Sequence, residues 1–385
     1  MKNLIIAAVL LIPAAAGAQQ NLKIGNMEVN PFMSTLESYD NNIYLTKTAT
    51  KGSSINRSSL GFGLIEKIGS RLNLAGGYSM EVLGYSRAPV TNDAVHHNAN
   101  VSATAKLPKE ATITLDDKYK QTTDQATSET TARALRVENT VGLNVAAPLR
   151  GKFGFGVALQ HIYNNYLNVA NKALDREETL AGFDVDYKLQ PKTKLFFNYR
   201  YGNLVYQASD VGNAVTNNMD VGLTGDIAPK IVGTVKAGMQ MRSYENALAT
   251  AKDEINTAGY SAQAVWTPMA KSEVIIYGKR GNVESSYGLS RFYTSSLIDL
   301  TITRQVNKIK AGLGLSYEGV LYPEKTTVTG RKRLDENASV RLTAVYNMQK
   351  WLTADFAYTY KDRTSNYDVF EYKSNVISLG IKALF

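Results

Sequence analysis

Apolar and polar residues alternate with a period of two along most of the chain. Between positions 194 and 201 the two sets are Leu195, Phe197, Tyr199 and Tyr201 on one side, and Lys194, Asn198 and Arg200 on the other. Successive side chains of a β-strand point to opposite faces, so this pattern predicts strands with one apolar and one polar face. The same pattern recurs at 231–242, 310–317 and 352–361.

Eight short turn regions separate the alternating segments. They lie at 66–69, 107–109, 148–151, 190–192, 228–230, 267–269, 305–307 and 347–350, and five of them contain Pro. Longer polar connections lie between them, for example at 46–55, 122–131, 168–175, 246–254 and 325–331. Short turns at one end and longer loops at the other are typical of outer-membrane barrels.

These patterns predict an all-β fold, a transmembrane antiparallel up-and-down β-barrel of about 18 strands. Eight turns join sixteen strands, and strands near 32–45 and 370–385 complete the count. We expect short periplasmic turns, longer extracellular loops, and hydrogen bonding between the last strand and the first. A soluble β-sandwich or β-helix is the alternative, but a sandwich would also need charged residues on its outer face.

The last predicted strand ends on an aromatic residue. Ile377, Leu379, Ile381 and Phe385 share its apolar face. This strand resembles the C-terminal strand of bacterial outer-membrane barrels, which in that family is also the assembly signal. The resemblance implies a location in the bacterial outer membrane. It also implies outer-membrane lipid, lipopolysaccharide and the barrel-insertion machinery as partners.

The first residues predict secretion. A short basic region at 1–3 precedes an apolar run at 4–16, and Ala16-Gly17-Ala18 forms a cleavage motif. We therefore expect a signal peptide at 1–18, a short periplasmic segment at 19–31 and the barrel at 32–385.

Composition fits a barrel and narrows its chemistry. The 23 Tyr suit aromatic girdles at both membrane interfaces, and the absence of Cys excludes disulfides and thiolate metal sites. The net charge is +9, but Lys and Arg are dispersed along the chain without a basic helix or tail. We therefore expect no nucleic-acid partner and a weak preference for anionic neighbours such as lipopolysaccharide or acidic glycans.

Charged residues on the polar faces are candidates for lining a pore. They are Arg136, Lys194, Arg200, Lys236, Arg242, Lys310, Arg341, Lys361, Asp184, Asp186, Asp299 and Asp355. On this hypothesis a polar lumen slightly favours anions and holds hydroxylated cargo. The alternative is that these charges pair with one another and only fill the barrel interior.

The three His residues give little support for catalysis. His96 and His97 are adjacent and therefore point to opposite faces, and His161 lies on an apolar face. No motif places a nucleophile beside them. Asp184 and Asp186 share a face and could hold a divalent cation, but solvated lumen charge is the simpler interpretation. We predict no enzyme, no catalytic residues, no metal and no cofactor.

Two segments resemble a known family. Residues 29–44 read VNPFMSTLESYDNNIY, and YKLQPKT at 187–193 is followed by LFFNYRY at 195–201. Both are similar to the β-barrel porin type 2 family. That resemblance implies an outer-membrane barrel, often associated with exopolysaccharide or capsule production, without catalytic residues to carry over.

Three functions remain open. The leading one is a porin-like barrel that passes hydrophilic solutes or exopolysaccharide, with polysaccharide-secretion components as partners. A structural or adhesive barrel acting through its outer loops is the second, and inward Tyr and Arg packed across the lumen would support it. A lipid-modifying barrel enzyme is the third.

Overall fold

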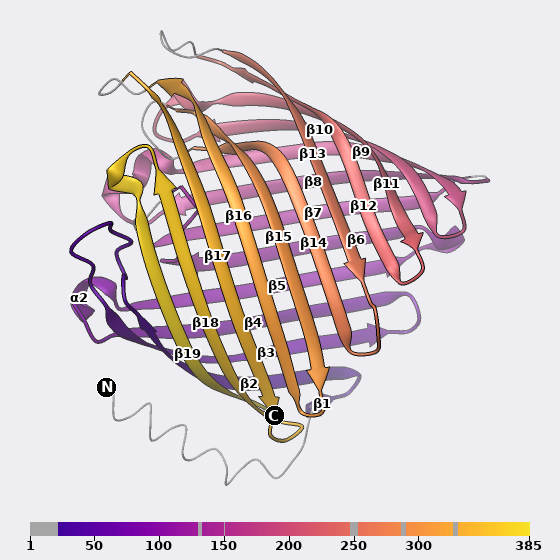
Figure 1. The fold of residues 1–385 in the computed structure, drawn as a ribbon. Helices are drawn as coiled ribbons and strands as arrows, with labels where there is room; N and C mark the ends of the chain where they lie inside the picture. The colour runs from indigo at the N-terminus through magenta and orange to yellow at the C-terminus, as the bar shows by residue number, and fades with distance from the viewer. Residues whose placement is uncertain (1–21, 130–132, 150, 247–252, 286–289, 326–329) are drawn as a thin grey trace.

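The chain forms a closed antiparallel barrel of 18 strands, β2 to β19, in which each strand pairs with its neighbours in sequence (Figure 1). A three-residue strand, β1 (Leu22–Ile24), pairs with β2. This computed structural model describes residues 22–129, 133–149, 151–246, 253–285, 290–325 and 330–385. The predicted signal peptide lies outside the described residues. The predicted all-β barrel is confirmed.

The barrel strands contain between 11 and 17 residues. The first nine are β2 (Met27–Asp40), β3 (Ser53–Ile68), β4 (Leu72–Tyr85), β5 (Ala94–Lys106), β6 (Thr112–Thr122), β7 (Arg136–Pro148), β8 (Phe153–Tyr166), β9 (Arg176–Gln190) and β10 (Thr193–Tyr206). The other nine are β11 (Ala214–Ala228), β12 (Ile231–Tyr244), β13 (Glu254–Trp266), β14 (Ser272–Glu284), β15 (Phe292–Val306), β16 (Ile309–Lys325), β17 (Lys332–Asn347), β18 (Leu352–Ser365) and β19 (Tyr372–Leu384).

The helices are short and lie in the connections. They are α2 (Pro89–Asn92), η2 (Pro108–Glu110), η3 (Val169–Leu174), η4 (Asp210–Gly212) and η5 (Asp368–Phe370). No helix in the described part of the chain is long and apolar enough to cross a membrane.

The two ends of the barrel differ in the length of their connections. Each of the eight predicted turns joins two consecutive strands, and all eight lie at one end, here called the turn end. The longer connections lie at the opposite end, here called the loop end. Figure 1 shows the C-terminus and β1 at the turn end.

The first and last strands close the barrel, as predicted. They pair from Val376 with Asp40 to Leu384 with Phe32. The first strand, however, occupies 27–40 rather than 32–45. It begins earlier because the chain turns at Gly25 (φ +64°) into a hairpin with β1. It ends earlier because the Asp40 carboxylate accepts the backbone N–H of Asn42 at 2.8 Å and turns the chain.

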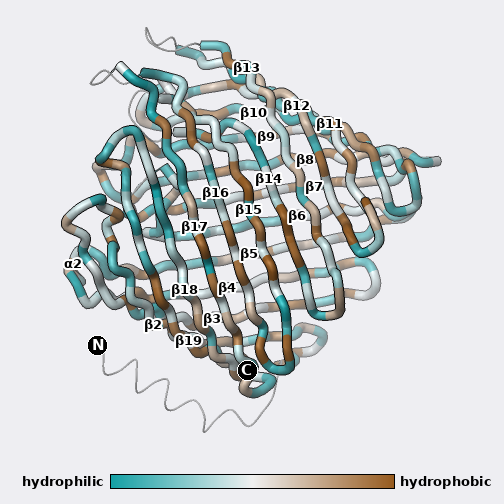
Figure 2. The backbone as a smooth tube through the Cα atoms, viewed as in Figure 1, coloured by the Kyte–Doolittle hydropathy of each residue, from teal (hydrophilic) through white to brown (hydrophobic). Residues whose placement is uncertain are grey.

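The wall of the barrel presents an apolar surface to its surroundings. Figure 2 shows hydrophobic residues spread over the strands of the wall, with hydrophilic residues at the connections. Large apolar side chains are well exposed there: Leu379 is 62% exposed, Leu60 58% and Ile298 55%. Such a continuous exposed apolar surface fits contact with lipid rather than water.

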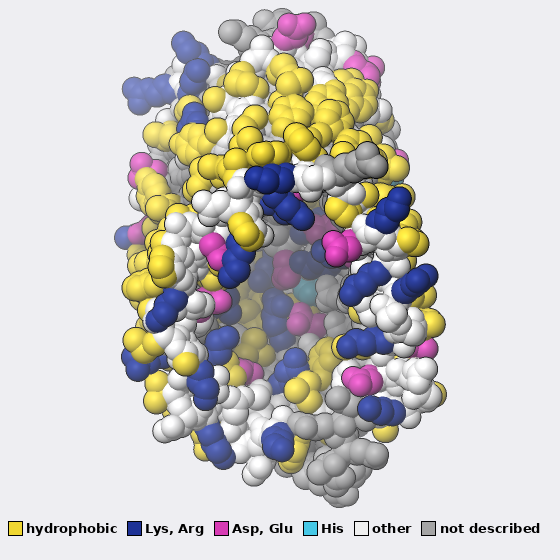
Figure 3. Space-filling view, turned by 90° about the vertical axis from the view of Figure 1, so that its right-hand side faces the viewer, with side chains coloured by type: hydrophobic (Ala, Val, Ile, Leu, Met, Phe, Trp, Pro, Cys, Tyr) yellow, Lys and Arg dark blue, Asp and Glu magenta, His cyan; other side chains and the backbone are white. Residues whose placement is uncertain are grey.

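Buried side chains gather at the loop end of the barrel interior. Three apolar clusters form there, containing Ile43, Ile55, Leu83 and Tyr85, then Ala214, Tyr244 and Phe292, then Tyr293, Val320 and Tyr322. The turn end is hollow by contrast. Figure 3 views the molecule from the right-hand side of Figure 1, where the turns lie, and shows a deep opening with charges of both signs. The interior is therefore narrowest towards the loop end.

Candidate functional site: the lumen and its inward loop

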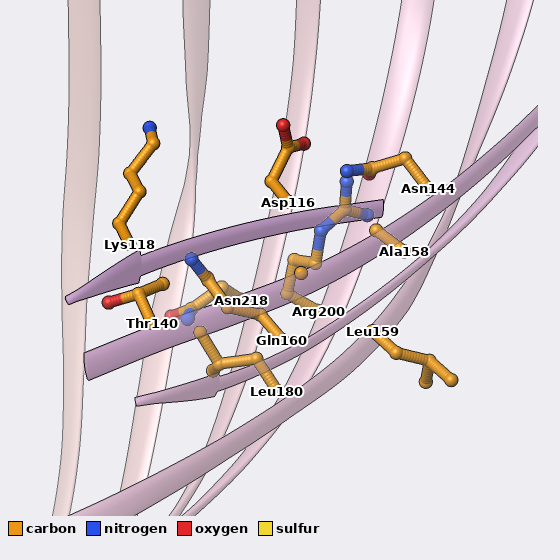
Figure 4. Close-up of a pocket in the computed structure, with 11 residues that line it drawn as sticks. Asp116, Lys118, Thr140, Asn144, Ala158, Leu159, Gln160, Leu180, Arg200 and Asn218 are labelled. Carbon is orange, nitrogen blue, oxygen red and sulfur yellow. The ribbon is translucent and has the colours of Figure 1, made fainter. Parts of the chain in front are cut away.

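A cavity of about 460 Å³, lined by both polar and apolar side chains, lies against the lumen wall formed by β6 to β11. Its polar lining residues are Asp116, Lys118, Thr140, Asn144, Gln160, Arg200 and Asn218. Figure 4 shows Arg200 and Asn144 pointing towards one another with Asp116 nearby, whereas Leu159 points away. Amides, a hydroxyl and charges of both signs suit contacts with hydrated polar molecules.

The register of the sheet shows which residues of every strand lie on the same inner face as this cavity. Residues directly opposite on neighbouring strands share a face, and Arg200 lies opposite Asn218 and Gly182. Followed from strand to strand, the register places all twelve predicted pore residues on the lumen face. They are Arg136, Lys194, Arg200, Lys236, Arg242, Lys310, Arg341, Lys361, Asp184, Asp186, Asp299 and Asp355. Their role in passage stays a prediction.

Several of these charges are paired within the wall. Arg200 donates two hydrogen bonds to the Asp184 carboxylate, at 2.8 and 2.9 Å. Lys194 lies 3.2 Å from Asp186. The same holds for Lys236 with Asp220 (2.8 Å), Arg136 with Glu138 (2.6 Å) and Arg242 with Glu284. By contrast, within the described ranges Lys310, Arg341 and Lys361 make no ion pair. The interpretation as structural pairs therefore holds for part of the set only.

The connection between β6 and β7, residues 123–135, enters the lumen and is here called the inward loop; residues 130–132 of it lie outside the described part. Its first residues bind the wall next to β6. Thr123 donates its backbone N–H to His96 Nε2 at 3.0 Å. Asp124 accepts a hydrogen bond from Arg57 at 3.2 Å, and Arg136 donates to its backbone carbonyl.

The neighbouring cationic side chains keep Asp124 ionised as a carboxylate. Burial raises its pKa, but the charges of Arg57 and His96, the hydrogen bond from Arg57 and the charge of Lys120 outweigh that effect. The net result is a pKa below the ordinary value. The contact with Arg57 is therefore present at neutral pH and is lost only in acid, as the pH falls through this lowered pKa.

The middle of the inward loop binds the opposite wall. Ser285, directly after β14, donates its hydroxyl to the Glu129 carboxylate at 2.5 Å. Arg363 on β18 donates to the backbone carbonyl of Glu129 at 3.4 Å. The side chains of Thr127 and Ser128 lie close to the Tyr293 hydroxyl on β15. Because β14 and β15 lie eight and nine strands away from β6 in the closed barrel of 18 strands, the inward loop crosses the lumen.

Arginine and aromatic side chains surround the far contact. The Arg333 guanidinium lies 3.4 Å from the ring centre of Phe370 and 4.6 Å from that of Tyr322. Arg363 lies 4.9 Å from the ring centre of Tyr372. Such cation–π contacts add about 0.5–2 kcal/mol each. This packing fills part of the loop end, as the structural-barrel alternative expects.

The histidines occupy the faces that strand alternation predicts. His96 is 2% exposed and lies inside, 3.3 Å from Glu81. His97 and His161 lie on the outer face, where they contact Tyr78 (2.8 Å) and Thr179 (3.0 Å). No group of three or more metal-binding side chains exists in the described part of the chain. Asp184 and Asp186 are already occupied by Arg200 and Lys194.

The predicted assembly residues lie where the wall meets lipid. Ile377, Leu379 and Ile381 are 50%, 62% and 45% exposed on the outer face. Phe385 donates its backbone N–H to the carbonyl of Pro31 at 2.9 Å. The geometry is compatible with the assembly role, which stays a prediction.

Comparison with known proteins gives a family and a fold. A family model described as "Putative beta-barrel porin 2" matches residues 18–385. No curated protein matches the sequence. Among solved structures, OccK9 (OpdG) of Pseudomonas aeruginosa has a TM-score of 0.53 at 8% identity, covering 94% of this chain and 99% of that one.

Two further structures give the same result. OpdK of Pseudomonas aeruginosa with vanillate has a TM-score of 0.52 at 9% identity and covers 93% and 99% of the two chains. OccAB4 of Acinetobacter baumannii has a TM-score of 0.50 at 10% identity and covers 93% and 98%. At these identities the likeness is one of fold, a porin-like outer-membrane barrel.

Proposed function

Because the chain belongs to the family described as "Putative beta-barrel porin 2", we propose that it is a channel for small hydrophilic solutes in the bacterial outer membrane. The observation that carries this proposal is the inward loop. It crosses a lumen with a charged, polar lining and is hydrogen-bonded to both walls. Such a loop leaves the wall intact and narrows the space within it, as a size filter requires.

The barrel has room for an aqueous path. Barrels of 16 to 18 strands leave a water-filled interior, whereas the interior of about eight strands is filled by side chains. Here the turn-end half is hollow (Figure 3), and a cavity of about 460 Å³ lies about halfway along the lumen wall. The constriction therefore lies in one layer near the loop end. A solute that passes this layer meets polar side chains on the rest of its way.

Passage of exopolysaccharide is the alternative that the family resemblance implies. A polymer in transit occupies the whole length of the lumen at once. The contacts of the inward loop with Arg57 and Ser285 would have to break for as long as the polymer is threaded. The docked loop therefore favours small solutes. Polysaccharide-secretion components are partners only under the polymer alternative.

A closed structural barrel is the second candidate, because the arginine and aromatic layer fills part of the loop end. Arg333 and Arg363 are fully buried there. On this view the outer loops carry the function and the interior serves stability. A lipid-modifying enzyme has less support, because within the described ranges the hydrogen-bond and ion-pair partners of His97 and His161, on the lipid-facing side, are Tyr78, Thr179 and Glu177.

Conductance separates these candidates. Purified, folded protein should produce discrete current steps in a planar lipid bilayer bathed in KCl, because the proposed channel requires a hydrated path between the two ends. Folding is checked by the shift in gel mobility between unheated and heated samples. A flat baseline from correctly folded protein would contradict the channel and favour the closed structural barrel.

The far contact of the inward loop gives a finer test. Glu129→Ala removes the acceptor for Ser285, and a hydrogen bond to a charged group is worth about 1.5–3 kcal/mol. The undocked population of the loop should therefore rise by about tenfold or more, seen as more frequent transitions to a larger conductance. Glu129→Gln keeps an acceptor oxygen and should behave almost as the native protein does. Equal noise in both variants and the native protein would mean that this contact does not hold the loop.

A further inference from the structure

The positive charge of the chain is concentrated at the turn end. The eight turns, each with three flanking strand residues on either side, contain fourteen Lys and Arg among their described residues and four Asp and Glu. The whole chain contains 43 Lys and Arg and 34 Asp and Glu. The turn end alone thus accounts for the net charge of +9, and the rest of the chain is close to neutral. Lys and Arg are dispersed along the sequence as expected, and the barrel brings those of distant turns together at one end.

The excess surrounds an opening. Figure 3 shows Lys and Arg on both sides of the hollow at this end, and at places above and below it. Each of the eight turn regions contributes at least one basic residue. Five of the lysines lie on the lumen face of β3, β5, β9, β10 and β16, and they are Lys67, Lys106, Lys188, Lys194 and Lys310. Only Lys194 of these five forms an ion pair within the described residues.

We infer that this basic ring collects small anionic solutes at the turn-end mouth of the channel; the inference rests on the proposed function. A mouth lined by charge of one sign concentrates ions of the opposite sign and speeds their entry. The solute class is small molecules with carboxylate or other anionic groups. Because the other end has no comparable excess, collection is stronger from the turn end than from the loop end.

The shape of the charge distribution favours a solute over a docking surface. A binding patch for an acidic protein would lie on one side of the molecule, whereas these residues circle the opening. Lipopolysaccharide is an unsuitable partner for the ring if the turns face the periplasm, as we expect, because it occupies the opposite leaflet. The lumen-facing lysines also point at whatever crosses the mouth rather than at the surrounding membrane.

The test removes the ring charge without touching the inward loop. The variant carries Lys67→Gln, Lys106→Gln, Lys188→Gln and Lys310→Gln. The matched control removes four exposed charges at the loop end, with Lys51→Gln, Arg87→Gln, Lys332→Gln and Lys373→Gln. Reversal potentials are measured in a KCl gradient across channels inserted in one orientation. Salt near 0.1 M is used, where the screening length is about 10 Å.

We expect the permeability ratio of chloride to potassium to fall by about twofold or more in the ring variant, and to stay unchanged in the control. The loss should be largest when the dilute solution bathes the turn end. A conducting ring variant with the native ratio would overturn this inference alone. A native protein that does not conduct at all would instead overturn the proposed function. If the ring variant does not fold, Lys109→Gln, Lys271→Gln and Lys350→Gln at the turn tips replace it.

Discussion

Shortening the inward loop should raise the single-channel conductance on the order of threefold. Replacing residues 125–134 by a short Gly-Ser linker removes Glu129 and its contacts with Ser285 and Arg363. The barrel itself should tolerate the change, because Thr122 and Arg136 already face each other at the ends of β6 and β7. The lumen then loses the segment that crosses it. Planar-bilayer recording in KCl measures the effect directly.

A second loop provides the control for this change. Residues 169–174 form η3 at the loop end, and Val169 there is 89% exposed. Replacing them with the same linker should leave the conductance unchanged. Native current levels from the variant lacking residues 125–134 would show that the arginine and aromatic layer sets the conductance instead of the loop. If the native protein gives no current but the variant lacking residues 125–134 conducts, the closed structural barrel is supported.

An arginine on the lipid face should destabilise the barrel strongly. Leu315 on β16 is 39% exposed on the outer face and lies within the apolar band. Placing a charge in hydrocarbon near the bilayer centre costs about 2–4 kcal/mol. Leu315→Arg should therefore lower the free energy of unfolding by an amount of this order. Denaturant unfolding in lipid vesicles, followed by tryptophan fluorescence, measures the change.

The neighbouring residue supplies the matched control. Ser316 follows Leu315 directly and faces the lumen, opposite Asp299 and Ser339. Ser316→Arg adds the same side chain on the wet side and should change the unfolding free energy little, because the carboxylate of Asp299 is close. Equal losses in the two variants would show that the outer face does not meet lipid. The measurement thus tests the assignment of the two faces independently of any transport.

The strands and their order were predictable because they depend on local patterns. Alternation of residues such as Leu195 and Lys194 defines a face without knowledge of the fold. Pro at 108, 191 and 229 marks turns because it cannot donate to a sheet. The exact start of the first strand was not predictable, since it depends on the hairpin at Gly25, which pairs β2 with three residues before it.

The inward loop could not be found from the sequence. Its described residues are mostly small and polar, as in any exposed connection, so the sequence predicts only one of the longer loops there. Its path depends on Arg57, Ser285 and Arg363, which lie up to 234 positions away along the chain. The basic ring was missed for a related reason. Its lysines are far apart in sequence and become neighbours only when the barrel closes.

Because β19 pairs with β2, the barrel has no open strand edge only when β19 is present. Until residues 376–384 are in place, β2 and β18 each present a row of unpaired backbone groups. In hydrocarbon such edges are costly, because their backbone groups have no hydrogen-bond partner. In water they pair with other chains and lead to aggregation. Proteases and chaperones should therefore bind a copy that lacks β19 at its unpaired edges. The barrel geometry thus distinguishes finished from unfinished chains, because β19 pairs with both β18 and β2.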